Sequence, residues 1–133
     1  MAGIHFMALP IAASMVLLLV HIGVQAITVT REFGSAWNAG PRDEELRPKG
    51  VLAGRAERAL RNYLETFPAF GILALTLAAM ERADGLGLFG ALLWLVGRII
   101  YLPLYLAGIP YWRSLAWTAA TGGLLLMVVR TIL

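Results

Sequence analysis

A stripe of polar side chains leads directly into an apolar segment in the first half of the chain. Arg58, Asn62 and Glu65 are spaced i, i+4 and i+7, so in a helix they lie on one face. Arg55 extends this stripe outward by one turn. Arginine and asparagine donate hydrogen bonds to carboxylates and peptide groups, and glutamate accepts them from an ammonium group. The stripe predicts either a binding surface for a small charged ligand or a local ion pair between Arg61 and Glu65.

A second polar stripe lies inside a later apolar segment. Its members, Arg98, Tyr101 and Tyr105, are spaced i, i+3 and i+7, so a helix again places them on one face. A guanidinium and two phenol hydroxyls need hydrogen-bond partners where lipid excludes water. Those partners are either Asn62 or Glu65, in a structural contact across a helix bundle, or a bound ligand.

Arg113 and Ser114 stand at the start of the last apolar segment. Arg113 either extends to the membrane interface or belongs with the two stripes. If it belongs with them, this polar layer holds the guanidinium groups of Arg58, Arg98 and Arg113 against the single carboxylate of Glu65. Such an excess of positive charge suits a ligand with two carboxylates and one ammonium group, which Glu65 would bind. The residues alone therefore predict an anionic, partly polar ligand at the inner edge of the membrane.

The composition is that of an integral membrane protein. Hydrophobic residues make up 59% of the 133 residues and charged residues 14%, whereas charged residues make up roughly 25% of soluble proteins. The formal net charge of +3 bears on membrane orientation, and nucleic-acid binding is not expected because no soluble face is large enough to carry it. With no cysteine and two histidines, we expect no disulfide, no protein thiol and no metal site.

Four apolar segments predict an all-α fold, an up-down four-helix bundle in one membrane domain over residues 1–133. The first segment lacks a positive leading region and is too long for a cleaved signal, so we interpret it as a retained helix. The uncharged part of the second is too short to span, so Glu65 lies inside the hydrocarbon edge, where an unpaired carboxylate is costly. Residues 31–54 are interpreted as a surface loop. The expected helices are about 6–29, 54–81, 86–106 and 112–130.

The basic residues predict the orientation of the bundle. The second loop carries only Arg82, so the positive-inside rule places loops one and three in the cytoplasm and both termini outside, in a bacterial inner membrane. Arg130 then extends to the outer interface. The first loop is rich in basic side chains, namely Arg31, Arg42, Arg47, Lys49 and Arg55, and the third is flanked by Arg98 and Arg113.

Several other residues predict packing. His21 and Gln25 are spaced i, i+4 in the first segment, which favours packing or an interhelical hydrogen bond. Gly122 and Gly123 in the last segment are typical of closely packed membrane helices. The four tryptophans are interpreted as interface or packing aromatics, at Trp37, Trp94, Trp112 and Trp117.

The stretch RAERALRNYLETFPAF resembles the signature of the MAPEG family, the membrane-associated proteins in eicosanoid and glutathione metabolism. The matching positions are Arg55, Arg58, Ala59, Asn62, Glu65, Phe67 and Pro68. The stretch GRIIYLPLYLAGIPYWRS resembles the second family motif, with Arg98, Tyr101 and Tyr105. The four-helix hydropathy also matches, so the resemblance covers nearly the whole chain, and the second motif is similar to that of a bacterial branch.

The resemblance implies a homotrimer in membrane lipid, with glutathione sites between neighbouring subunits on the cytoplasmic side. It implies that the two polar stripes bind glutathione and that Arg113, followed by Ser114, stabilises the glutathione thiolate, if one residue is missing from the loop before it. The thiolate would then attack a hydrophobic electrophile or reduce a lipid hydroperoxide. The chain departs from the family pattern at Thr66, where several members carry tyrosine, and at Pro103, which lies between the two tyrosines.

Two other classes of function remain open from the sequence. One is a non-catalytic lipid-binding or scaffold protein of the same fold, which would not need to keep a peptide-binding polar layer. The other is a small channel or transporter that uses Arg98 and Glu65 as a polar path, although no polar stripe runs through the full membrane depth. The retained polar layer favours the enzyme, a glutathione-dependent transferase or peroxidase.

Overall fold

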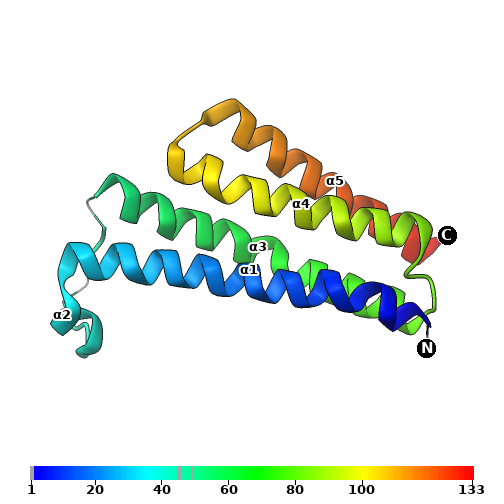
Figure 1. Ribbon diagram of the computed structural model, residues 1–133, viewed down its shortest axis with the longest axis horizontal. Helices are drawn as coiled ribbons and strands as arrows, with labels where there is room; N and C mark the ends of the chain where they lie inside the picture. The colour runs from blue at the N-terminus through cyan, green and yellow to red at the C-terminus, as the bar shows by residue number, and fades with distance from the viewer. Residues whose placement is uncertain (1, 45, 49) are drawn as a thin grey trace.

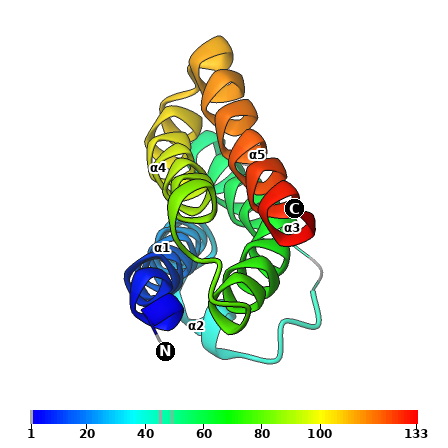
Figure 2. The ribbon, with the colours of Figure 1, turned by 90° about the vertical axis from the view of Figure 1, so that its right-hand side faces the viewer.

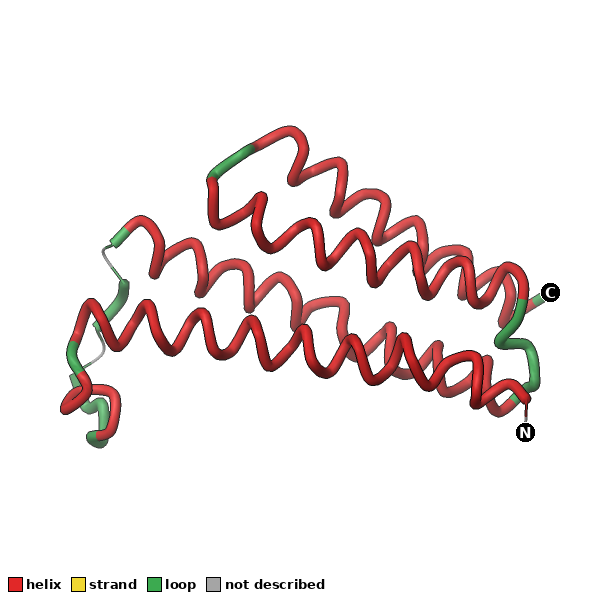
Figure 3. The backbone as a smooth tube through the Cα atoms, in the orientation of Figure 1, coloured by secondary structure: helices red, strands yellow, loops and turns green. Residues whose placement is uncertain are grey.

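The computed structural model describes residues 2–44, 46–48 and 50–133, so Lys49 of the first loop lies outside the described residues. Within them the chain forms helices and loops and no strand (Figure 3). The all-α fold expected from the sequence is confirmed. The helices are α1 (Ala2–Phe33), α2 (Ser35–Ala39), α3 (Val51–Ala79), α4 (Gly85–Ala107) and α5 (Pro110–Ile132).

The four long helices run up and down beside one another (Figure 1). Helix α1 pairs with α3 and α4 pairs with α5, and the end view shows the two pairs packed together (Figure 2). Both termini and the connection from α3 to α4 lie at one end of the bundle, which we call the terminal end (Figure 1). The α1–α3 connection, with α2, and the turn between α4 and α5 lie at the other, which we call the loop end. The short α3–α4 and α4–α5 connections favour this antiparallel arrangement.

Each long helix begins before the residue expected from the apolar pattern, because helical hydrogen bonding continues into the polar residues at the bundle ends. Residues 31–54 are accordingly not one continuous loop: α1 continues to Phe33, α2 forms after it and α3 starts at Val51. Helix α4 also continues past Pro103 to Ala107, so Tyr105 stays on the same helix as Arg98. Neighbouring helices make such internal prolines tolerable in membrane bundles.

The turn between α4 and α5 brings the start of α5 back beside the end of α4. Gly108 ends α4 in the left-handed conformation, with φ +75°, which glycine adopts without a side-chain clash. Pro110 then occupies the first turn of α5, where its missing N–H leaves no helical hydrogen bond unmade. As a result, Arg113 lies within one turn of the start of α5, close to the last turns of α4.

Close contacts between helices build the core. Helices α4 and α5 form the most extensive pair, and an ideal Cβ placed on Gly90 would lie 2.6 Å from the carbonyl oxygen of Gly123. Trp94 is fully buried and stacks on Phe70, with ring centroids 4.0 Å apart and ring planes 8° apart. Trp94 is therefore a packing aromatic, whereas Trp112 is 66% exposed.

The outer surface of the bundle is apolar. Many large hydrophobic side chains are exposed, among them Leu9, Ile72 and Leu125. Of the helices in the described part of the chain, α1, α4 and α5 are long and apolar enough to cross a membrane. Helix α3 is as long as they are, but its first half carries the charged stripe and so lowers its hydropathy. Length and composition together make the chain an integral membrane protein.

Candidate functional site

The two predicted polar stripes face each other between α3 and α4. The Arg98 guanidinium donates a 2.7 Å hydrogen bond from one terminal nitrogen to the side-chain oxygen of Asn62. One turn nearer the loop end, Arg58 Nε donates a 3.2 Å hydrogen bond to the Tyr105 hydroxyl. The Asn62 amide in turn donates to Glu65 Oε2 at 3.4 Å. Of the partners that the sequence left open for Arg98, the structure shows Asn62.

Arg98 is a buried cation held between aromatic rings. Only 1% of the residue is exposed. Its guanidinium carbon lies 4.6 Å from the ring centroid of Tyr101 and 5.3 Å from that of Tyr63. Aromatic faces attract a cation, more strongly where water is excluded. Arg98 Nε and its second terminal nitrogen have no hydrogen-bond partner among the residues the structure describes, so Asn62 and the two rings are the contacts that hold it.

Arg113 of α5 joins this layer through a ring contact. Its guanidinium carbon lies 4.7 Å from the ring centroid of Tyr105. The rings of Tyr105 and Tyr101 are themselves 5.4 Å apart. Ser114 Oγ donates to the Pro110 carbonyl at 3.2 Å, which leaves the lone pairs of this hydroxyl oxygen available to a ligand. Helix α5 thus places a guanidinium and a hydroxyl on neighbouring positions at the end of α4.

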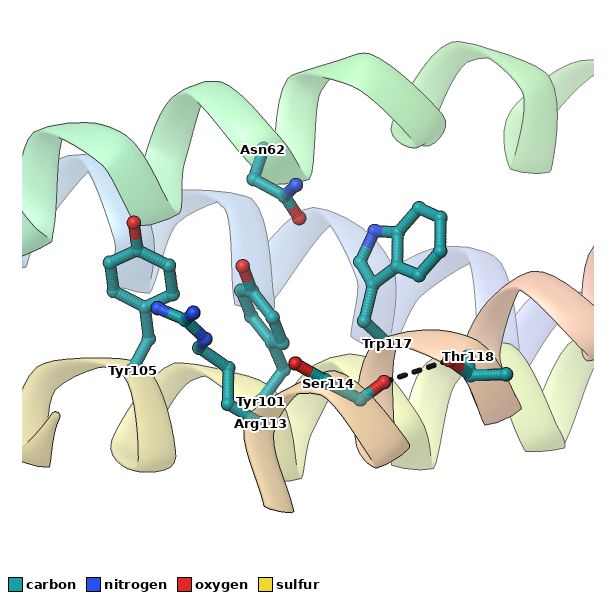
Figure 4. A pocket seen from close by; sticks show the side chains of 7 residues that line it. All are labelled: Asn62, Tyr101, Tyr105, Arg113, Ser114, Trp117 and Thr118. Carbon is teal, nitrogen blue, oxygen red and sulfur yellow. Dashed lines mark hydrogen bonds between the residues drawn. The ribbon is translucent and has the colours of Figure 1, made fainter. Parts of the chain in front are cut away.

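These side chains line one open cavity of about 500 Å³ between α3, α4 and α5. Figure 4 shows Arg113 beside the two tyrosines, with Trp117 farther along α5 and Asn62 on α3 opposite them. The volume falls within the roughly 300–1,000 Å³ of small-molecule sites. The lining residues are Asn62, Tyr101, Tyr105, Arg113, Ser114, Trp117 and Thr118.

The remaining predicted site residues lie around the cavity and do not line it. Arg58 and Glu65 are exposed beside it on α3, and Arg98 lies buried behind Asn62 and Tyr101. Arg55 reaches away from the cavity and donates a 3.0 Å hydrogen bond to the Leu106 carbonyl near the end of α4. Arg61 pairs with Glu57 at 3.2 Å, so the structure does not form the local pair between Arg61 and Glu65.

Sequence reasoning did not assign two lining residues, Trp117 and Thr118, to the site. Trp117 lies four residues after Arg113 and Thr118 four residues after Ser114, so helical spacing places each pair on one face of α5. The Thr118 hydroxyl donates to the Ser114 carbonyl at 2.9 Å, the contact drawn in Figure 4. That spacing was the signal that could have identified both residues.

The cavity is suited to a negatively charged group. It presents the Arg113 guanidinium, phenol and serine hydroxyls and the Asn62 amide, with a second guanidinium directly behind its wall. Positive charge near a thiol lowers the thiol pKa, because it favours the thiolate. No group of three or more histidine, cysteine, aspartate or glutamate side chains in the described residues could hold a metal ion. The guanidinium and the polar hydrogen-bond donors of the cavity wall can attract an anion.

The fold and the cavity together define a class of protein: a helical membrane bundle with a cationic pocket among its helices. The chain belongs to the MAPEG family, whose model matches residues 10–133, and this confirms the family inferred from the two motifs. A comparison with curated proteins found no match. Family membership places the chain among the membrane proteins of eicosanoid and glutathione metabolism.

Proposed function

We propose that the protein is a glutathione-dependent transferase or peroxidase that acts on hydrophobic electrophiles or lipid hydroperoxides. The observation that carries this proposal is the Arg113 guanidinium in the cavity wall, 4.7 Å from the Tyr105 ring. Glutathione is a small peptide with two carboxylates, one ammonium group and one thiol. The surplus of arginine over carboxylate around the cavity matches that charge pattern.

In this proposal Arg113 and Ser114 act on the glutathione sulfur. The guanidinium stabilises the thiolate as the thiol proton leaves to solvent, and the Ser114 hydroxyl turns from the Pro110 carbonyl to donate its proton to the same sulfur. In the transferase reaction the sulfur forms a bond to an electrophilic carbon. In a substitution the bond from that carbon to its leaving group breaks and the group departs as an anion, whereas in an addition to an activated double bond the resulting carbanion takes up a proton from solvent. In the peroxidase reaction the sulfur attacks a hydroperoxide oxygen and releases an alcohol, and a second glutathione converts the resulting sulfenic acid to the disulfide and water.

The rest of the polar layer would bind the peptide. Asn62, Tyr101 and Tyr105 line the cavity and can bond to backbone and carboxylate groups of the ligand. Arg58 and Glu65 are exposed on α3 beside the cavity, where Glu65 is available to the ammonium group. Because they are exposed, Arg58 and Glu65 would also be accessible to glutathione bound between neighbouring subunits of the homotrimer in membrane lipid that the family resemblance implies.

The second substrate would lie against Trp117. Trp117 is the one large apolar side chain among the residues that line the cavity, and it is 37% exposed. Leu115 on the same helix is 59% exposed, so the apolar outer surface reaches the cavity rim. A hydrophobic electrophile dissolved in lipid could therefore reach the thiolate from the membrane.

The position of the cavity fits the proposed orientation. The positive-inside rule places loops one and three in the cytoplasm of a bacterial cell. Both loops are at the loop end of the bundle, and Arg113 lies within a turn of the second of them (Figure 1). The cavity would thus open near the compartment that holds glutathione.

A glutathione titration with thiolate absorbance tests the proposal. Detergent-purified wild-type protein should show saturable binding with a thiolate signal, and Arg113→Ala should lose that signal. Arg130→Ala is the matched control, because Arg130 lies on the same helix at the terminal end and pairs with Asp84 at 3.2 Å. Wild-type protein that binds no glutathione at millimolar concentration would contradict the proposal.

The second candidate is a non-catalytic lipid-binding or scaffold protein. The exposed Arg58 and the apolar side chains at the cavity rim favour it, because together they could hold an anionic lipid headgroup and its acyl chain. Mass spectrometry of the purified protein, with and without Arg113→Ala, would find a bound anionic lipid in this case. Turnover of a hydrophobic electrophile with glutathione would exclude it.

A further inference from the structure

A buried stack of side chains connects helix α1 to the cavity wall. The His21 imidazole lies face to face with the Tyr63 ring of α3, with centroids 4.6 Å apart and planes 25° apart. His21 is 1% exposed and Tyr63 is fully buried. Both nitrogens of His21 lack a hydrogen-bond partner among the residues described. The contact that the structure shows for His21 is therefore the one made by its ring face.

Tyr63 is fixed by helix α1 on more than one side. Its hydroxyl donates a short, 2.6 Å hydrogen bond to the backbone carbonyl of Ser14, and Ser14 is itself 1% exposed. The His21 ring covers a face of the phenol about two turns farther along α1. A phenol held at its hydroxyl and over its ring has little freedom to shift or tilt, because a close-packed interior leaves no empty volume for it.

The Tyr63 ring leads on to Arg98 and from there to the cavity. The Arg98 guanidinium carbon is 5.3 Å from the Tyr63 ring centroid and 4.6 Å from that of Tyr101. The same guanidinium donates the 2.7 Å hydrogen bond to Asn62. Asn62 and Tyr101 are both cavity-lining residues. Four contacts thus join His21, which does not line the cavity, to two residues that do.

We propose that His21 and Tyr63 are positioning residues: they hold Arg98 so that it fixes the Asn62 amide and the Tyr101 ring at the cavity wall. The affinity for the peptide ligand is then set partly from helix α1. This inference rests on the proposed function for its ligand, glutathione, while the placement of Arg98 can be measured without any ligand. Cations and donors held by outer-shell partners bind their ligands more tightly than mobile ones, because less order is lost on binding.

The test compares three variants of the full chain in detergent. His21→Ala removes the ring that covers Tyr63, and His21→Phe keeps an aromatic ring but removes both nitrogens. Met7→Ala is the packing control, because Met7 is fully buried in the same core and lies on the same helix about four turns from His21. Each variant is measured for its melting temperature, for its glutathione affinity and, without ligand, for the Arg98 Nε–H resonance in protein labelled with ¹⁵N-arginine. Arg98→Lys assigns that resonance by its loss.

We expect the wild-type Arg98 resonance to be shifted upfield by the rings on which the guanidinium lies. His21→Ala should move it toward the position of exposed arginines and weaken glutathione binding by about tenfold, the size typical of lost outer-shell partners. His21→Phe should keep both the Arg98 resonance and the glutathione affinity close to those of the wild type. Met7→Ala should lower the melting temperature without changing the Arg98 resonance or the glutathione affinity, because it loosens the core several turns away from the ring stack.

Several results would overturn the inference. One is an Arg98 resonance unchanged in His21→Ala, and another is His21→Phe behaving like His21→Ala. A third is Met7→Ala shifting the resonance and the affinity as much as His21→Ala, since general loosening would then explain the effect. If the wild type binds no glutathione, the proposed function fails, and the ligand-free resonance still decides whether His21 positions Arg98.

Discussion

Arg98 of α4 donates a 2.7 Å hydrogen bond to the side-chain oxygen of Asn62 on α3, and this contact joins a fully buried cation to the wall of the cavity. A guanidinium in a membrane bundle is stable only where its charge and its N–H groups are satisfied by protein. Asn62 supplies the one side-chain acceptor that the structure shows for Arg98. The residue that lines the site therefore also stabilises the bundle.

Asn62→Leu should destabilise the protein by about 2–3 kcal/mol, because it leaves a buried charged donor without its acceptor. Asn62→Asp should destabilise it less, since a carboxylate accepts the same hydrogen bond from Arg98, although the exposed bond from the Asn62 amide to Glu65 is lost. Denaturant unfolding in detergent measures the difference. The control is Arg61→Ala, which removes the exposed pair with Glu57 and should cost less than about 1 kcal/mol. Equal stabilities for Asn62→Leu and Arg61→Ala would show that the buried hydrogen bond does not stabilise the fold.

Gly123→Ala should destabilise the α4–α5 contact, whereas Gly122→Ala should not. A Cβ on Gly123 would lie 2.5 Å from the Gly90 carbonyl oxygen and 2.7 Å from the Trp94 backbone nitrogen, while nothing lies within 4 Å of a Cβ on Gly122. Overpacking of this kind costs about 1–3 kcal/mol, and alanine is favoured over glycine in a helix by about 1 kcal/mol. Thermal melts of the two variants give the comparison, and similar melting temperatures would be the contrary result.

Arg55→Ala should affect stability more than ligand binding. Arg55 donates to the Leu106 carbonyl at 3.0 Å, close to the left-handed Gly108 that ends α4, and a cation there also interacts favourably with the helix dipole. We expect a loss of about 1 kcal/mol in unfolding free energy, with a smaller change in glutathione affinity than Arg58→Ala causes. A stable Arg55→Ala protein that no longer binds glutathione would instead place Arg55 on the ligand, as the family resemblance implies.

Trp117→Ala should raise the KM for a hydrophobic electrophile by roughly tenfold, because a large apolar contact is lost. Its glutathione affinity should remain that of the wild type, since the peptide would lie on the polar side of the cavity. Steady-state kinetics with the electrophile varied at saturating glutathione measure the first quantity. Trp112→Ala serves as the control, as Trp112 is exposed on the same helix outside the cavity lining. Equal effects of the two tryptophan variants on KM would contradict the placement of the second substrate.

Which polar residues share one face of a helix could be predicted from the sequence, because helical spacing alone decides it. Arg98 in an apolar segment had to find a partner on another helix, and Asn62 was one of the two side chains expected to provide it. The family motifs located the same residues. The up-down arrangement followed from four apolar segments, joined by short connections apart from residues 31–54, and the structure agrees with it.

The depth and rotation of each helix relative to its neighbours could not be predicted, because they depend on packing between segments far apart in the chain. Arg55 and Arg58 share a stripe, yet one bonds to the backbone of α4 and the other to the Tyr105 hydroxyl. Adjacent Gly122 and Gly123 look alike in the sequence, but only Gly123 touches α4. Tyr63 lies between the polar residues Asn62 and Glu65 of α3. Nothing in the sequence indicates the ring stack that Tyr63 forms.

Both chain termini lie at the terminal end of the bundle (Figure 1). Arg113 lies at the opposite end, next to the α4–α5 turn. A fluorescent protein, an affinity tag or a surface tether attached at either terminus would therefore project away from the cavity mouth. The protein could be immobilised through either terminus on a sensor surface with the cavity left open to injected ligand.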